Sequence, residues 1–315
     1  MMSIQAKIAA LMMRYQMRDF YKDLSIEVQR AKMTKYAKAM KLPANVTCEP
    51  AKGSPVPAEW ITSPNLGQDR ILLYLHGGAY YLSYDNPHRN LVARLGRGAG
   101  MRSLVVDYRL APEHPYPAAL EDVTDTYQWL LEKGYLSHNI AIAGDSCGGG
   151  LALSTLLRLR DTGLPFPTAV VCISPWVDLT GSGLSMKSKA KADFINIPEH
   201  MKTNAKNYAG EHDLKTPFIS PLFADLTGFP PLLIQAATRD ILLDDATHLA
   251  EQAHRAKVNV TLEVWDGMFH VFQLGAGFVP EAQKAVDNVA DFLRHHVGTK
   301  KLTSHLALIA RHKRS

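Results

Sequence analysis

Short apolar runs rich in Val, Ile and Leu alternate along this chain with longer segments in which apolar residues recur every three or four positions. The first pattern is typical of strands buried on both faces, and the second of amphipathic helices that cover a sheet. The expected strands are 71–75, 103–106, 139–143, 169–173, 231–236 and 260–264. The expected helices are about 89–98, 118–133, 149–160, 245–256 and 281–296. This alternation predicts an α/β fold with a mostly parallel, doubly wound central sheet.

Two parts of the chain depart from this rhythm. Apolar residues recur with helical spacing between Ile4 and Tyr15, and a second helix is expected over 25–40. The Pro- and Gly-rich stretch 43–64 is expected to form loops and edge structure. The connection over 178–229 is about fifty residues long, more than a crossover needs, so we expect inserted helices there.

The composition indicates a soluble globular protein of 315 residues, with 46% hydrophobic and 21% charged residues. Its net charge of +5 arises in the tail 299–315, which holds five Lys or Arg and no acid. No nucleic-acid-binding motif accompanies this tail, so nucleic acid is not an expected partner. The longest stretch without a charged residue, 162–177, contains three prolines and cannot span a bilayer as a helix. Three scattered cysteines and the short apolar N-terminal segment predict a reducing, cytoplasmic location and no metal site.

A serine lies in the most specific motif of the chain, GDSCG at 144–148, between an expected strand and an expected helix. A tight turn from strand to helix projects the Ser146 hydroxyl above the sheet edge, and the flanking glycines allow the sharp bend. The N-terminus of the following helix favours developing negative charge. A glycine–serine–glycine pattern alone is often a plain turn, but this position predicts that Ser146 is a nucleophile.

A serine hydroxyl is a poor nucleophile unless a base removes its proton, so the chain must supply a histidine. In this architecture the chain order is serine, acid, histidine, and the partners lie in loops after later strands. Nine histidines follow Ser146, and His270 alone lies directly after an expected strand and before the last long helix. We therefore predict that His270 is the general base.

The acid that orients this histidine is predicted to be Asp240. It follows the apolar run 231–236, at the carboxyl end of a strand, where open α/β sheets place their sites. Asp244 and Asp245 compete, but they are better interpreted as first-turn acids of the next helix. Asp240 is expected to hold His270 in the right tautomer and to stabilise the imidazolium without taking its proton.

Donors for an oxyanion are expected from the segment HGGAYY at 76–81, which follows the first long apolar run. In hydrolases with this serine turn, N–H groups of such an earlier loop join the N–H after the nucleophile. The expected oxyanion hole comprises Gly77, Gly78, Ala79 and Cys147, with Gly77 forming the turn and the others donating. Cys147 is expected to act only through its backbone.

These residues resemble a known family, the hormone-sensitive-lipase-like carboxylesterases, also called bacterial family IV esterases. The resemblance covers about 71–297 and rests on HGGAYY at 76–81, DYRLAPEHPYPAAL at 107–120, GDSCGGG at 144–150, SPWVDLT at 174–180, and the loops around Asp240 and His270. It implies an α/β-hydrolase fold and hydrolysis of short- to medium-chain carboxylic esters, without cofactor or metal. It also implies that Glu113 holds a loop beneath the site.

The same resemblance divides the chain into parts. Residues 1–45 are expected to form N-terminal helices of a cap, 46–298 the catalytic domain with a cap insertion at about 180–228, and 299–315 a basic tail. The expected partner is a small-molecule ester, with Tyr80 and Tyr81 as lining residues. Neither nucleic acid nor stable membrane insertion is expected, and a homodimer is left open because relatives often dimerise.

Two positions depart from the family pattern. Ala79 stands where a third glycine is usual, which adds a methyl group without removing an N–H donor. Cys147 stands where alanine is usual, and its oxidisable side chain leads us to expect activity that is sensitive to thiol reagents.

Other functions remain open on the sequence. A ligand-binding receptor on the same fold would lack the histidine, and His270 is present. An amidase or lactonase would use the same groups, so the motifs do not separate it from an esterase. Membrane-surface docking through the methionine-rich first helix and the basic tail is a further alternative.

Overall fold

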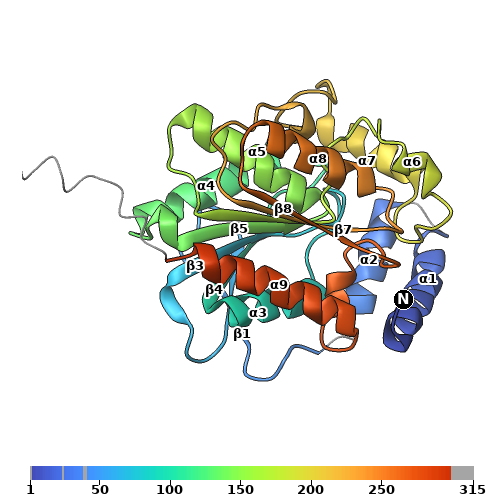
Figure 1. Cartoon of the computed structure of the whole chain (residues 1–315), viewed down its shortest axis with the longest axis horizontal. Helices are drawn as coiled ribbons and strands as arrows, with labels where there is room; N and C mark the ends of the chain where they lie inside the picture. Colours follow the sequence, from blue (N-terminus) through green and yellow to red (C-terminus); the bar gives the residue numbers. More distant parts are fainter. Residues whose placement is uncertain (1, 23–24, 38–40, 299–315) are drawn as a thin grey trace, which may run out of the picture.

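The computed structural model describes residues 2–22, 25–37 and 41–298 and shows one central sheet between two layers of helices (Figure 1). In this part of the chain the sheet has eight strands in the order β1-β2-β4-β3-β5-β6-β7-β8. The pairs from β4 through β3 to β8 are all parallel, and β2 runs antiparallel to both of its neighbours. The strands are β1 (Thr47–Pro50), β2 (Ala58–Thr62), β3 (Gly67–Leu75), β4 (Met101–Val106), β5 (Ile140–Asp145), β6 (Ala169–Ile173), β7 (Leu232–Ala237) and β8 (Val260–Trp265).

The six strands expected from apolar runs are all present and form the parallel part of the sheet, which confirms the predicted fold class. The stretch 43–64, expected as loop and edge structure, contains the two further strands β1 and β2. These strands are short and mostly not buried, so they lack the apolar run that marks a central strand. Pairing of β2 with β4 fixes their place at the sheet edge.

Side chains of the central strands point alternately into two cores. In β3, Leu73 and Leu75 belong to the core that also contains residues of helices α4, α5 and α8, whereas Leu72 and Tyr74 belong to the core that contains residues of α3 and α9. This double burial explains why the strand reads as a continuous apolar run rather than an alternating one. The covering helices are α3 (Asn86–Ala99), α4 (Ala118–Glu132), α5 (Cys147–Thr162), α8 (Leu243–Arg255) and α9 (Pro280–His296).

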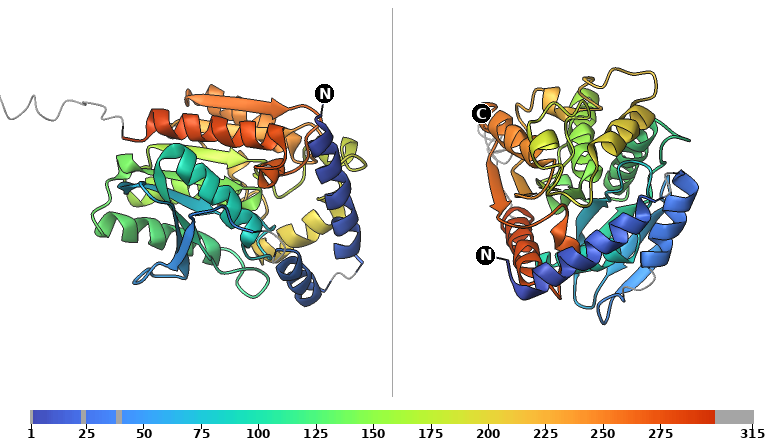
Figure 2. Two further views of the ribbon diagram at one scale, coloured as in Figure 1. Left: turned by 90° about the horizontal axis from the view of Figure 1, so that it is seen from below. Right: turned by 90° about the vertical axis from the view of Figure 1, so that its right-hand side faces the viewer.

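Four further helices gather at one end of the sheet (Figures 1 and 2). They are α1 (Ile4–Phe20) and α2 (Ile26–Ala37) from the N-terminal part, and α6 (Ser185–Ser188) and α7 (Pro198–Ala209) from the long connection after β6. Met17 and Phe20 of α1 pack with Tyr81 and Ile195, so a small apolar cluster joins the two groups of helices to the loop after β3. The Tyr21 hydroxyl also donates to the Ile195 carbonyl at 2.6 Å.

The guanidinium group of Arg30 connects α2 to the body of the protein through several hydrogen bonds. Arg30 donates from Nε to the Tyr81 carbonyl at 2.8 Å and from Nη2 to the Ala111 carbonyl at 3.2 Å. Both terminal nitrogens also reach the Glu113 carboxylate, at 2.6 and 2.9 Å. Glu113 was expected to hold a loop beneath the site. Its side chain is about half exposed and pairs with Arg30 of α2, which also donates to the Ala111 carbonyl of that loop, and the expected role stays a prediction.

Among the described residues, no helix combines the length and the apolar character needed to cross a lipid bilayer. The basic tail 299–315 lies outside the described residues.

Candidate active site

Ser146 occupies the turn between β5 and α5 with φ 52° and ψ −123°. A non-glycine residue adopts such angles only when its surroundings hold it there. The Ser146 N–H donates to the Ile173 carbonyl at 2.8 Å, and the Ser146 carbonyl accepts from the Trp176 N–H at 2.9 Å. Neighbouring Gly148 is required because a Cβ there would overlap the Leu75 carbonyl of β3. The backbone is therefore fixed on both sides of the serine, as a strained turn that presents a nucleophile requires.

His270 and Asp240 lie in the loops that follow β8 and β7, and they are hydrogen-bonded to each other. His270 Nδ1 is 2.8 Å from Asp240 Oδ2, and the other carboxylate oxygen accepts from the Leu242 N–H at 2.9 Å. A carboxylate can only accept, so Nδ1 carries the proton and Nε2 is left as the basic nitrogen. Burial disfavours the imidazolium, but the carboxylates of Asp240, Asp193 and Asp145, with Asp240 first, together raise the pKa of His270 above its usual value.

The two competing acids make different contacts. Asp244 and Asp245 lie in the first turn of α8, as the sequence indicated. The Asp245 carboxylate accepts from the N–H groups of Val177 and Asp178, both at 2.9 Å. Asp244 accepts from the Ser185 N–H at 2.8 Å. Both acids therefore hold the connection after β6, and Asp240 is the one bonded to His270.

The parallel strands bring the serine, the histidine and the acid to one edge of the sheet. β5, β7 and β8 run in the same direction, so the residues that follow them share the carboxyl edge. The loop after β3, from His76 onward, belongs to this edge as well, because β3 is parallel to β5.

This loop carries three successive residues with positive φ: Gly78 at 122°, Ala79 at 49° and Tyr80 at 63°. The Gly77 N–H donates to Asp145 Oδ1 at 2.9 Å, so Gly77 anchors the turn to the end of β5. Within the described part of the chain, the N–H groups of Gly78 and Cys147 donate to no protein acceptor. These two donors are thus available to a ligand at the start of α5.

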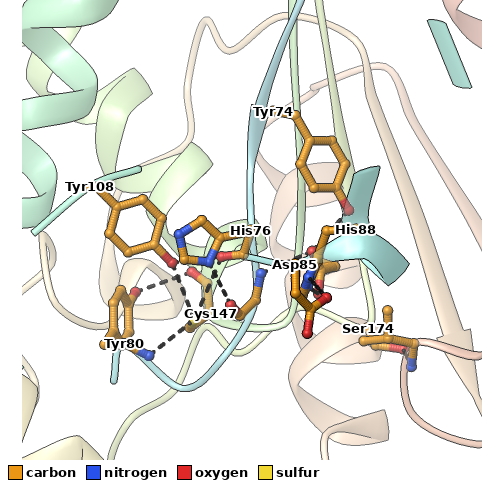
Figure 3. A network of polar contacts seen from close by, with 11 residues as sticks. Tyr74, His76, Tyr80, Asp85, His88, Tyr108, Cys147 and Ser174 are labelled. Atoms are coloured by element: carbon orange, nitrogen blue, oxygen red, sulfur yellow. Dashed lines mark hydrogen bonds and ion pairs between the residues drawn. The ribbon is translucent and has the colours of Figure 1, made fainter. Parts of the chain in front are cut away.

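The thiol of Cys147 supports the same loop. It is fully buried, and its sulfur accepts from the Tyr80 N–H at 3.3 Å (Figure 3). Burial raises the pKa of the thiol to about 12, although the N–H groups of Tyr80 and Ala79 act against the rise. The thiol is therefore protonated near neutral pH and is not a nucleophile. Burial should make attack by thiol reagents slow, because such reagents react with an accessible thiolate, and the expected sensitivity of the activity to them stays a prediction.

Tyr80 and Tyr81, expected as lining residues, are both buried. The Tyr80 ring stacks on Tyr208 with centroids 3.5 Å apart, and its hydroxyl donates to the Cys147 carbonyl at 3.2 Å. Tyr81 packs in one apolar cluster with Phe20 of α1. These contacts hold the loop after β3 in place.

A buried polar network that the sequence did not reveal lies behind this loop (Figure 3). The Tyr74 hydroxyl donates to Asp145 at 2.8 Å, and His88 Nε2 lies 3.7 Å from the same carboxylate. His88 Nδ1 is 3.1 Å from Asp85. Burial disfavours charge on His88, but the two carboxylates raise its pKa to about 10. Because Asp145 also holds Gly77, this ion pair stabilises the turn of the loop.

A second missed residue, Asp193, belongs to the connection after β6. Its side chain is buried, and Oδ1 accepts from the N–H groups of Ile195 and Asn196 at 2.8 and 3.0 Å. Burial, followed by the nearby Asp240, raises the pKa of Asp193 to about 6. No motif marks this residue in the sequence, because its role depends on how the connection folds back over the sheet.

In the part of the chain that the structure describes, no group of three or more His, Cys, Asp or Glu residues is arranged to hold a metal ion.

Comparison with known proteins gives the family. Residues 72–274 match the family model described as the alpha/beta hydrolase fold. The chain is 42% identical over 241 residues to an acetyl-hydrolase of Streptomyces hygroscopicus, covering 76% of this chain and 80% of that protein. It is 39% identical over 225 residues to an esterase of Acinetobacter venetianus, covering 71% and 74% of the two chains. A crystal structure of an esterase from the bacterial hormone-sensitive lipase family matches with a TM-score of 0.89 at 38% identity, covering 94% of this chain and 99% of that one.

The chain belongs to the hormone-sensitive-lipase-like esterases of the α/β-hydrolase fold. This esterase is therefore an enzyme of the carboxylic ester hydrolase class.

Proposed function

We propose that this esterase hydrolyses short- to medium-chain carboxylic esters through an acyl-enzyme on Ser146, with His270 as general base and acid and Asp240 as the orienting acid. The observation that carries the proposal is the 2.8 Å contact between His270 Nδ1 and Asp240 at the sheet edge where Ser146 stands in a strained turn. It leaves Nε2 basic, as proton transfer from a serine hydroxyl requires.

In the first half of the reaction, Ser146 Oγ attacks the ester carbonyl while His270 Nε2 takes its proton. The oxyanion that forms accepts hydrogen bonds from the N–H groups of Gly78 and Cys147. Ala79, the third expected donor, can join them only if its N–H turns away from the Cys147 sulfur. The bond to the leaving alcohol then breaks, and the imidazolium returns the proton to the departing oxygen. Asp240 stabilises the charged His270 throughout without becoming protonated.

In the second half, water attacks the acyl-enzyme. His270 Nε2 takes a proton from the water, the same N–H groups hold the second oxyanion, and the proton passes to Ser146 Oγ as the carboxylic acid leaves. The chemistry uses only side chains and backbone groups of the chain. The name of the Streptomyces relative, an acetyl-hydrolase, supports a preference for short acyl groups.

We also propose the division of the chain into a cap, formed by 1–45 and the insertion at about 180–228, and a catalytic domain over 46–298. The apolar cluster of Phe20, Tyr81 and Ile195 supports it, because both cap parts meet over the loop after β3. A cap in this position limits access to Ser146 and so selects the acyl chain.

The test is hydrolysis of p-nitrophenyl esters of increasing acyl length by the wild type, Ser146→Ala and His270→Ala. Each variant should lose about 10³-fold or more in kcat, equivalent to about 4 kcal/mol of transition-state stabilisation. His254→Ala, which changes an exposed histidine of α8, is the matched control and should keep full activity. Turnover that survives Ser146→Ala would contradict the acyl-enzyme, and faster cleavage of the matching anilides would assign an amidase instead.

A further inference from the structure

Helix α1 is apolar on two opposite faces. Its inner face, with Ala6, Ala10, Met17 and Phe20, is buried against the body. At 100° per residue, a second set of five apolar residues lies within an arc of about 100° on the outer face. This outer face consists of Ile4, Ile8, Leu11, Met12 and Tyr15, which are 73%, 45%, 71%, 64% and 78% exposed. Nothing in the described part of the chain covers it.

The border of the outer face is cationic. Lys7, Arg14 and Arg18 are exposed and follow one another along one side of the apolar arc, and none forms an ion pair with a described residue. Asp19 is the one acid of the helix. It is already engaged, because it accepts from the Tyr36 hydroxyl at 2.7 Å and lies 3.2 Å from Lys22 Nζ. The surface therefore combines an apolar stripe with unneutralised positive charge.

We propose that the outer face of α1 is a reversible docking surface for a lipid bilayer that carries anionic headgroups. An amphipathic helix binds an interface by burying its apolar face at the headgroup boundary while cations at its border meet anionic lipids. A bilayer accommodates five exposed apolar side chains on one helix without a complementary protein surface. The arrangement corresponds to adsorption on the surface and not to insertion across it.

A second copy of the chain fits this surface less well. In a two-fold dimer the same patch meets itself, so the contact must be self-complementary. The patch carries three unneutralised cations and no unpaired acid to match them. An anionic surface supplies the missing charge, whereas a second copy would add positive charge.

The position of α1 gives docking a functional consequence, which rests on the proposed ester hydrolysis. The inner face of α1 packs on Tyr81 and lies beside Ala79, in the loop expected to supply the oxyanion donors. Figure 2 shows α1 lying across the same end of the molecule. Docking through the outer face would therefore hold the active-site end of the sheet next to the bilayer, where esters of low water solubility collect.

The test is co-sedimentation of the full-length protein with vesicles of phosphatidylcholine alone or mixed with phosphatidylglycerol. The wild type should bind the anionic vesicles, and added salt should weaken binding. Leu11→Glu should lower the partition coefficient about tenfold or more, because it places a charge in the apolar face. The matched control is Leu136→Glu, which changes an exposed leucine (55%) just before the short 3-10 helix Ser137–Asn139 that precedes β5, and it should bind like the wild type.

Three results would overturn the proposal: equal binding of Leu11→Glu and the wild type, equal binding to neutral and anionic vesicles, or a wild-type dimer that Leu11→Glu dissociates without vesicle binding. The last is read by light scattering and would assign the face to a second copy. Hydrolysis of p-nitrophenyl acetate in solution is measured in parallel. Failure of the proposed chemistry would abolish that hydrolysis and leave vesicle binding intact, so the two failures are distinguishable.

Discussion

The Asp193 carboxylate accepts a hydrogen bond from the Ile241 N–H at 3.0 Å, one residue after Asp240. The contact joins the long connection after β6 to the loop that holds the proposed orienting acid. Through Ile195, whose carbonyl binds the Tyr21 hydroxyl, the same segment is connected to the N-terminal helices. A short series of contacts therefore connects the position of the N-terminal helices to the charged groups that surround His270.

Replacement of Asp193 by Asn should move the acid limb of kcat/KM to lower pH. Burial lowers the pKa of His270, the Asp240 carboxylate raises it, and Asp193 raises it further. His270 must be neutral to act as a base, so loss of the second charge should let it work at lower pH. The measurement is the pH–rate profile of ester hydrolysis.

Asp213→Asn is the control for this shift, because Asp213 makes the same turn contact, to the Lys215 N–H at 2.9 Å, at an exposed position. Its profile should match the wild type. If the acid limb of the pH–rate profile is the same in Asp193→Asn and the wild type, Asp193 has no electrostatic effect on His270 and only holds the loop.

Removal of His88 should destabilise the protein more at neutral pH than at about pH 10. Burial opposes the charge on His88, yet its pKa is raised to about 10, so its stabilising contribution is complete below the unfolded value of 6.5 and is lost as the pH rises through about 10. His88→Gln leaves the buried Asp145 without its cation, which costs about 3–5 kcal/mol in free energy of unfolding. Urea denaturation should show this loss at neutral pH and a smaller loss at about pH 10.

His138→Gln provides the comparison for His88, because His138 is exposed and its replacement should change the free energy of unfolding little at either pH. A loss in His88→Gln that is the same at both pH values would show that His88 is not charged in the folded protein.

Alkylation of the native enzyme should modify Cys48 before Cys147. Cys147 is fully buried with a pKa of about 12, whereas Cys48 is partly accessible. Iodoacetamide treatment followed by peptide mass spectrometry measures both sites, and activity should survive while Cys147 is unmodified. Cys147→Ala should lower kcat/KM by less than about tenfold, because only weak contacts to the sulfur, such as that of the Tyr80 N–H, are lost and the Cys147 N–H donor is retained. Equal labelling rates at the two cysteines would contradict the burial of Cys147.

The Arg30–Glu113 pair should couple α2 to the loop after β3. The pair is partly exposed, so a double-mutant cycle with Arg30→Gln and Glu113→Gln should give a coupling energy of about 1 kcal/mol or less. Arg30→Gln should cost more than Glu113→Gln, because it also removes the bonds to the carbonyls of Tyr81 and Ala111. Thermal unfolding measures the loss of stability, and kcat/KM measures the effect on the loop after β3. Equal losses in Arg30→Gln and Glu113→Gln would contradict the prediction that Arg30→Gln is the more damaging change.

Local signals in the sequence determined the parallel strands and the proposed catalytic residues. A strand buried on both faces must be apolar along its length, and a parallel sheet places its functional groups directly after such strands. Ser146 and Asp240 each follow an apolar run, and His270 follows the alternating edge segment 260–264, so each could be selected from its position in the chain. The same rule failed for β1 and β2, whose residues are not buried on both faces.

The tertiary structure alone decided the contacts between distant segments. Asp193 meets Ile241, His88 meets Asp145, and the exposed Glu113 pairs with Arg30, each across tens of residues of chain. These residues lie in helices or connections whose local sequence does not indicate the partner. A charged side chain is buried or paired only after folding brings the opposite group next to it. The sequence therefore determined which residues stand at the sheet edge, and folding decided which charges surround them.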